Sequence, residues 1–255
     1  MRENFYYIIA VMRIFGALAL AAAVAATSCT GVFRQYEYEE DLYLSLDGTA
    51  TLYVNSSIAA LGALRGASFD PSPIAVVDRA AVRDYFSSPF AHVSGRVATS
   101  RRSGRRFVHV RMIVDDVRSL ARMAPFAWST YVFTRDGDQY EYQQTIGASA
   151  ARPVPAAGWT GRELVAFRLH LPSKITYHNA GPGNMRRGNI LVWEQSLADR
   201  LRGVPLTLEA RMETESILYR TVLLFAATFI AVAVTFVVII WRILRRGVSE
   251  EQRAA

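Results

Sequence analysis

Hydrophobic residues occupy alternate positions over two neighbouring stretches near the start of the chain. The alternation covers residues 36–46 and is repeated over residues 49–55. Between them, Asp47-Gly48 is a typical two-residue hairpin turn, because both positions favour a left-handed backbone. The pattern therefore predicts an antiparallel hairpin.

Helical and extended segments then follow one another at short spacing. Ser56 or Ser57 can cap a helix that runs to Arg65, a second helix is expected over residues 78–86, and Asp115 can cap a third before Pro125. Further strands are expected at residues 92–99, 107–114, 128–134, 139–146, 163–171, 174–178, 189–194 and 206–212. Many hairpins with few helices predict an α+β fold, with a mainly antiparallel sheet and about three short helices.

The N-terminal segment has the features of an export signal. Arg13 precedes a charge-free apolar run over residues 14–26, and small residues follow up to Cys29. This order is typical of a secretory signal peptide, here residues 1–28, and either Met1 or Met12 fits as the first residue. The block Ala26-Thr27-Ser28-Cys29 is similar to a bacterial lipobox, which makes Cys29 the candidate lipidation site. An ordinary signal peptide without lipidation is the alternative.

The C-terminal segment predicts a transmembrane helix over residues 217–242. Residues 221–241 carry no charge, and at about 1.5 Å per residue they cross a hydrocarbon core of about 30 Å. Arginines follow at once, at positions 242, 245 and 246, so the tail 243–255 is expected in the cytoplasm. Residues 29–216 then form an extracytoplasmic domain, and the polar end of the tail is expected to be disordered.

Composition and charge exclude several classes of protein. A mean hydropathy of +0.14 with 20% charged residues fits a soluble domain joined to apolar segments. One cysteine excludes a disulfide scaffold and any multi-thiolate zinc or iron–sulfur site. Of the 29 basic and 22 acidic residues, 22 and 19 fall within residues 30–216. The domain itself is therefore close to neutral, which argues against nucleic-acid binding.

Motifs for catalysis, cofactors and metals are missing from the sequence. It contains no nucleophile elbow, zinc-protease motif, phosphate-binding loop or dinucleotide fingerprint. His170 and His178 could meet Glu194 or Asp199 in space, but no spacing selects a metal site. We therefore predict no enzyme activity, no cofactor and no metal, although a serine nucleophile with a histidine base stays open.

The most unusual local feature is an arginine-rich turn over residues 101–106. Clustered guanidiniums repel one another unless anions neutralise them, and on a membrane-tethered domain lipid phosphates are suitable anions. The alternatives are a solvated turn, or neutralisation by Asp115 or Asp116 within the fold. The candidate headgroup-binding residues are Arg101, Arg102, Arg105 and Arg106.

One stretch resembles a known family. Residues 169–197 read LHLPSKITYHNAGPGNMRRGNILVWEQSL, with a Leu-Pro strand end, an Asn-Ala-Gly turn, a Gly-Asn pair and Trp193. This order is similar to the closing motif of the LppM-type domain of bacterial envelope lipoproteins, and the layout of signal, cysteine, domain and C-terminal helix is similar too. The resemblance implies a non-enzymatic envelope domain, in a family where lipid or glycolipid binding is proposed for some members, and it carries over no site residues.

These features together predict a bacterial cell-envelope membrane protein. Its exported domain would bind, or help to handle, an amphiphilic envelope component, for which a deep apolar cavity is expected. A protein-interaction module with a flat apolar surface is the alternative. A membrane-tethered hydrolase is a third class and requires histidine, carboxylate and nucleophile to converge.

Overall fold

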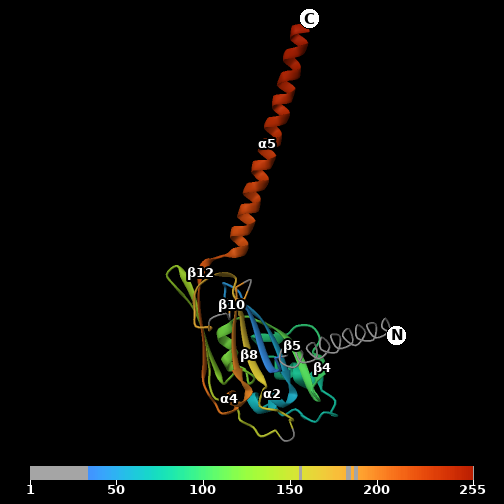
Figure 1. The fold of residues 1–255 in the computed structure, drawn as a ribbon, viewed down its shortest axis with the longest axis vertical. Helices are drawn as coiled ribbons and strands as arrows, with labels where there is room; N and C mark the ends of the chain where they lie inside the picture. The colour runs from blue at the N-terminus through green and yellow to red at the C-terminus, as the bar shows by residue number, and fades with distance from the viewer. Residues whose placement is uncertain (1–33, 155–156, 182–184, 187–188, 255) are drawn as a thin grey trace, which may run out of the picture. The chain divides into compact units, whose positions relative to one another are not determined.

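A computed structural model describes residues 34–154, 157–181, 185–186 and 189–254 of the chain (Figure 1). In this part of the chain the strands form two sheets. The larger sheet contains β1 (Tyr36–Leu44), β2 (Ala50–Ser57), β3 (Ala91–Val93), β4 (Ala98–Arg102), β5 (Arg105–Val114), β8 (Leu164–His170), β10 (Met185–Arg186) and β11 (Ile190–Ser196). The smaller sheet contains β6 (Ser129–Asp136), β7 (Gln139–Ile146), β9 (Ser173–His178) and β12 (Leu206–Ser216).

The strand order confirms the predicted α+β fold. The larger sheet runs β10-β11-β8-β1-β2-β5-β3, with β4 also paired to β5, and the smaller sheet runs β6-β7-β12-β9. All these pairs are antiparallel except β1 and β8, which lie parallel in the centre of the larger sheet. A parallel pair needs a long connection, and here the whole β6–β7 hairpin lies within it.

The first hairpin forms where it was predicted, but its turn is longer than two residues: the N–H of Ser45 donates to Thr49 O at 2.9 Å, which leaves Leu46, Asp47 and Gly48 in the loop. Leu44 pairs with Ala50, and Gly48 has a φ of +87°. The Asp47 carboxylate accepts hydrogen bonds from the backbone N–H of Thr49 at 3.0 Å and from its hydroxyl at 2.7 Å. The turn therefore closes on its own polar groups, which fixes the register of β1 against β2.

The expected helices form with two corrections. Ser57 caps α2 (Ile58–Arg65) and Asp78 caps α3 (Arg79–Tyr85). The third is a short 3₁₀ helix, η1 (Val117–Arg122), capped by Asp116 rather than Asp115. A segment this short between β5 and Pro125 suits the tighter helix, because few i→i−4 bonds fit in it.

Two other elements differ from the sequence prediction. The strand expected over residues 92–99 is divided into β3 and β4, because Gly95 turns the chain with a φ of +75°. The helix α4 (Leu197–Leu201), capped by Ser196, was not predicted at all. It is a single turn and too short to show a hydrophobic period.

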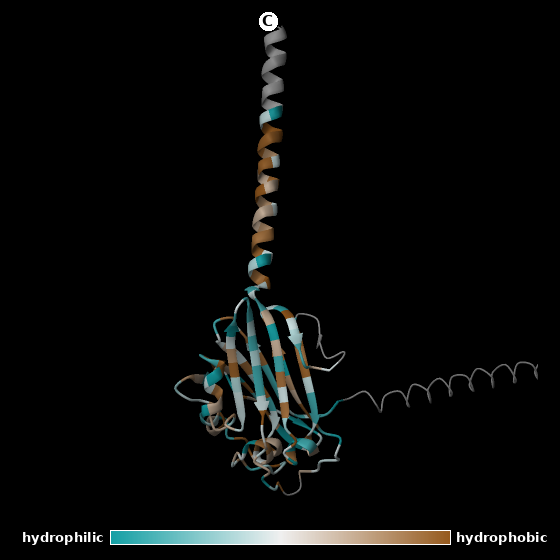
Figure 2. Cartoon of the chain, turned by 90° about the vertical axis from the view of Figure 1, so that its left-hand side faces the viewer, coloured by the Kyte–Doolittle hydropathy of each residue, from teal (hydrophilic) through white to brown (hydrophobic). Residues whose placement is uncertain are grey.

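The core lies between the two sheets and at one end of them. Tyr38, Leu42 and Leu52 from the larger sheet are buried, as are Tyr142 and Leu208 from the smaller one. Figure 2 shows the resulting alternation of hydrophobic and hydrophilic positions along the strands. All eight residues of α2 are buried, because this helix packs against β1, β2, β5 and α4.

The long helix α5 (Ile217–Ala254) follows β12 directly. Its first 26 residues, Ile217–Arg242, are long and apolar enough to cross a membrane, and Figure 2 shows them mostly brown. Thr221, Thr228 and Thr235 each donate a 2.8 Å hydrogen bond to the carbonyl four residues earlier, which satisfies their hydroxyls in an apolar surrounding. The tail expected to be disordered continues as helix to Ala254.

Candidate functional site

A groove beside α2 is the strongest candidate for a ligand site. Its volume is about 310 Å³, which lies at the lower end of the range of about 300–1,000 Å³ typical of ligand pockets. The lining is mostly apolar, with one charged side chain: Ile58, Gly62, Ala67, Ser68, Phe69, Pro71, Arg152, Pro153 and Val154. This composition suits a small amphiphile, because apolar walls bind the chain and a guanidinium can bind an anionic head.

Backbone hydrogen bonds hold the wall formed by residues 152–154 to the end of α2, which forms the opposite wall of the groove. The N–H of Ala150 donates to Leu64 O at 3.0 Å, and the N–H of Arg152 donates to Ala63 O at 3.3 Å. These bonds satisfy carbonyls that the end of a helix leaves free. The Arg152 guanidinium donates to Ala67 O and Ser68 Oγ at 3.3 and 3.2 Å, so the groove is built rather than a chance gap.

Gly62 gives the groove its width. A methyl group at this position would lie 3.5 Å from Ala67 O and 3.6 Å from Val154 Cγ2, both ordinary contact distances. Alanine therefore fits, whereas a longer side chain would enter the space between α2 and Val154.

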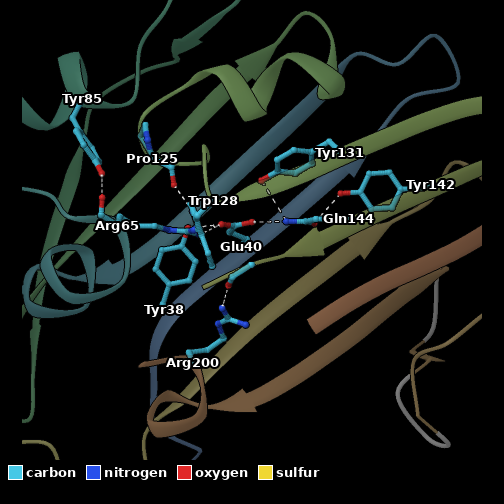
Figure 3. A network of polar contacts seen from close by, with 11 residues as sticks. Tyr38, Glu40, Arg65, Tyr85, Pro125, Trp128, Tyr131, Tyr142, Gln144 and Arg200 are labelled. Carbon is cyan, nitrogen blue, oxygen red and sulfur yellow. Dashed lines mark hydrogen bonds and ion pairs between the residues drawn. The ribbon is translucent and has the colours of Figure 1, made fainter. Parts of the chain in front are cut away.

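A buried polar network crosses from α2 to both sheets (Figure 3). Arg65, the last residue of α2, donates to the hydroxyl of Tyr38 and to the carboxylate of Glu40 on β1. Its guanidinium also lies 3.2 Å from the ring centroid of Trp128. The second Glu40 oxygen accepts from Gln144 Nε2 on β7 at 3.5 Å, so one carboxylate joins the two sheets.

This interior is closed. The cavity lined by Glu40, Gln144, Arg168 and mostly apolar side chains measures about 10 Å³, which is room for one water molecule and not for an acyl chain. Burial raises the pKa values of three tyrosine hydroxyls well above the ordinary value: Tyr38, Tyr131 and Tyr142. The space between the sheets is thus not the deep cavity expected for a lipid binder.

A serine, a histidine and an amide meet on the outer face of the larger sheet. His109 Nε2 lies 2.8 Å from Ser100 Oγ, and His109 Nδ1 lies 2.9 Å from Asn55 Oδ1. With the amide oxygen accepting from Nδ1–H, Nε2 is left to accept from the serine hydroxyl. Burial, with the nearby Arg102 charge, lowers the pKa of His109, which favours the neutral base at pH 7. The group therefore has the order of nucleophile, base and orienting residue.

The arginine-rich turn is not a uniform cationic tip. Arg105 is buried: its Nη2 lies 2.9 Å from a Glu37 carboxylate oxygen, and it also donates to Ala157 O and Gly158 O. As a headgroup-binding residue Arg105 was predicted wrongly, because a partner inside the fold already neutralises it. Arg102 lies over the ring of Phe107 at 4.1 Å. Headgroup binding by Arg101, Arg102 and Arg106 stays a prediction.

The acidic residues proposed to neutralise the turn do not do so. Asp116 pairs with Arg118 at 2.8 Å and caps η1 at the far end of β5. Asp115 lies beside it and donates its backbone N–H to Phe90 O. Glu37 on β1 takes this role for Arg105 alone, and no local pattern predicts the pair because β1 is far away along the chain.

The remaining sequence candidates lie apart from these sites. Cys29 and the predicted signal peptide lie outside the described residues. Within the described ranges no group of three or more His, Cys, Asp or Glu side chains is placed to hold a metal. His170 stacks on Tyr43 at 3.7 Å, and His178 lies near Ala180 O at 3.1 Å, so both have structural contacts of their own.

Comparison with known proteins gives one distant likeness. No protein-family model matches the chain, and neither does any curated protein. Among solved structures, the chain is similar to the folded domain of the LppM protein of Mycobacterium tuberculosis, with 15% identity and a TM-score of 0.38. The match covers 72% of this chain and 94% of that domain. Similarity at this level assigns no family, so the resemblance over residues 169–197 stays a prediction.

Proposed function

We propose that the chain is a membrane-anchored cell-envelope protein whose exported domain binds a single-chain anionic amphiphile in the groove beside α2. The observation that supports this most is the groove itself, with apolar walls and one guanidinium at Arg152. A volume of about 310 Å³ suits one short apolar chain rather than a two-chain lipid. The candidate membrane helix Ile217–Arg242 supports the anchoring.

The proposal explains why Arg152 is at this position without a carboxylate partner among the described residues. Among the residues that the structure describes, its guanidinium bonds only to the neutral acceptors Ala67 O and Ser68 Oγ, so its charge is left for an anion. A carboxylate or phosphate at the end of an apolar chain would complete these contacts. The apolar wall formed by Phe69 and Val154 would then cover the chain.

The test uses the full chain in lipid nanodiscs with a photoactivatable fatty acid. We expect crosslinks in the peptides that carry residues 58–71 and 152–154. Gly62→Leu should fill the groove and abolish these crosslinks, whereas Gly62→Ala should keep them because a methyl group fits. Arg152→Ser should weaken the labelling on the order of fivefold, the loss of one exposed charged contact.

The controls separate binding from general membrane contact. A photoactivatable alkane without the carboxyl group should label the groove less than the fatty acid does, and Arg152→Ser should not change that labelling. Equal labelling of the parent and of Gly62→Leu would rule out the groove as the binding site.

A second candidate function rests on Ser100, His109 and Asn55. We infer that this group can act as a serine hydrolase centre, because the two hydrogen bonds have the geometry of an activated nucleophile. A fluorophosphonate probe should label the full chain at Ser100, and both Ser100→Ala and His109→Gln should abolish the labelling. If the parent chain is not labelled, the group is only a hydrogen-bonded part of the sheet surface.

A further inference from the structure

The loop between α2 and α3 exposes two large apolar side chains. Ile74 is 84% exposed and Val76 is 90% exposed, more than any other large apolar residue outside α5 in the described chain. Pro73 precedes them and limits the freedom of the loop. Fully exposed aliphatic side chains on a stiff loop are typical of a surface that inserts into an apolar phase.

Two arginines of the β4–β5 turn hold this loop through one carbonyl group. The guanidiniums of Arg101 and Arg106 both donate to Pro73 O, and the distance from Arg106 Nε is 2.9 Å. Arg106 Nη2 also donates to Ile74 O at 3.3 Å. Two guanidiniums therefore lie beside one neutral oxygen. Neither has an ion pair with a carboxylate anywhere in the described ranges, so a phosphate between them would relieve their repulsion.

The nearest carboxylates on the same loop are occupied by backbone groups. Asp70 accepts from the N–H of Ser72 at 2.8 Å, and Asp78 caps α3 by accepting from Ala80 and Ala81. Arg79, the first residue of α3, adds positive charge on the adjacent segment, where its guanidinium donates to Thr99 Oγ1 at 3.2 Å. Positive charge thus lies directly beside the loop segment that carries the two apolar side chains, at Arg101 and Arg106.

We propose that Ile74, Val76, Arg101 and Arg106 form a docking surface for an anionic phospholipid bilayer, separate from the membrane that holds α5. The apolar side chains would enter the interface while the two guanidiniums bind lipid phosphates. This inference goes beyond the proposed amphiphile groove and does not rest on it.

Strand register places this surface far from the start of α5. The β4–β5 turn lies at the first residue of β5. Val114, the last residue of β5, pairs with Ala50 on β2, and Ala50 in turn pairs with Leu44 on β1. Tyr43, which precedes Leu44 on β1, pairs with His170, the last residue of β8. Two residues after His170, the carbonyl of Pro172 accepts a 3.1 Å hydrogen bond from the N–H of Ile217, the first residue of α5. The ten residues of β5 span roughly 30 Å, so the docking surface and the beginning of α5 lie at opposite ends of the strands.

The experiment uses the full chain reconstituted through α5 into neutral phosphatidylcholine vesicles. A second population of fluorescent vesicles contains phosphatidylcholine with a graded fraction of phosphatidylglycerol. Capture of the second population by the first should rise with the anionic fraction and fall as salt shortens the screening length. Arg101→Ser/Arg106→Ser should reduce the capture on the order of 30-fold, as expected for two phosphate contacts.

Matched variants keep the result clear if one protein folds poorly. Ile74→Ser/Val76→Ser changes only exposed side chains and should also abolish capture, whereas Arg111→Ser/Arg122→Ser removes the same charge elsewhere and should not. Capture that is absent, or equal in all variants, would overturn the proposal. If inorganic phosphate binds to the parent more tightly than to Arg101→Ser/Arg106→Ser while no vesicles are captured, the site is for a free anion and the bilayer proposal is wrong.

Discussion

Arg65 and Glu40 form a buried ion pair that joins the end of α2 to the central strand of the larger sheet. The exposed fraction of the side chain is 0% for Arg65 and 5% for Glu40. Trp128 covers the guanidinium, whose Nε and Nη1 have no hydrogen-bond partner among the described residues. The ring therefore takes the place of a polar partner through a cation–π contact.

Removing one member of this pair should destabilise the protein strongly. Arg65→Met leaves the Glu40 carboxylate buried without its cation, and we expect a loss of about 3–5 kcal/mol in the free energy of unfolding. Arg65→Met/Glu40→Leu should recover part of this loss, because no unpaired charge is left. Urea unfolding of the full chain in detergent, followed by tryptophan fluorescence, measures both variants. A loss as small as that of the exposed Arg122→Met would contradict a structural role for the pair.

Local signals in the sequence were sufficient for most of the fold. Asp47-Gly48 defines the first hairpin, and Ser57 and Gly66 mark both ends of α2, because each acts on its own neighbours. The parallel pairing of β1 with β8 was not predictable in this way. It depends on contacts between segments more than a hundred residues apart, and no local pattern encodes them.

The candidate sites likewise differ in whether local sequence signals or contacts between distant segments bring their residues together. The two-residue turn at Ser103-Gly104 sets Ala98 opposite His109, so the closeness of Ser100 and His109 could have been derived from the sequence if the turn had been placed at these two residues rather than over residues 101–106. The groove could not, because its walls come from α2 and from residues 152–154, a stretch that showed only proline and glycine signals. Pairing of Arg105 with Glu37 likewise depends on the tertiary fold.

Alkaline pH should unfold the protein through its buried tyrosines. Burial raises the pKa values of Tyr38, Tyr131 and Tyr142 in the folded state, so above about pH 10 the unfolded chain loses these protons first. The folded state then binds more protons, and stability falls as pH rises through this range, while below it the contribution is fully present. Arg200 acts in the opposite direction, because burial lowers its pKa to about 10, but it is one group against three.

Tyrosinate absorbance during a pH titration measures this effect. We expect Tyr38, Tyr131 and Tyr142 to titrate together, in one step that coincides with the loss of structure. Tyr131→Phe should remove one group from the cooperative step. Smooth titration of all tyrosines with the fold intact would show that the three hydroxyls reach solvent.

The arginine turn should divide into one structural and three surface residues. Arg105→Met removes the buried guanidinium that pairs with Glu37 at 2.9 Å and should cost about 3–5 kcal/mol of stability. Arg102 is exposed and lies three residues before Arg105 in the β4–β5 hairpin, so Arg102→Met should change stability by about 0.5 kcal/mol or less. Thermal unfolding of the two variants in the same detergent compares them. Equal losses would mean that Arg105 is solvated like its neighbours.

Cys29 is expected to carry lipid. The small-residue block before a single cysteine fits a lipobox, and the cysteine has no second thiol in the chain with which to form a disulfide. Radiolabelled fatty acid should be incorporated into the parent chain in bacterial cells and not into Cys29→Ser. Labelling of both to the same extent would leave only an ordinary signal peptide.

The orientation of α5 gives the last prediction. Residues 217–242 are apolar, and the positive-inside rule places Arg242, Arg245 and Arg246 in the cytoplasm, with the domain before Ile217 outside. Alkaline phosphatase, which is active only outside the membrane, should therefore be active when fused after Ser216 and inactive after Ala255. Arg242→Glu/Arg245→Glu/Arg246→Glu should reduce this bias, because acidic residues do not hold a helix end in the cytoplasm. Activity of both fusions would mean that α5 does not cross the membrane, and the bilayer would then no longer separate the domain from the tail.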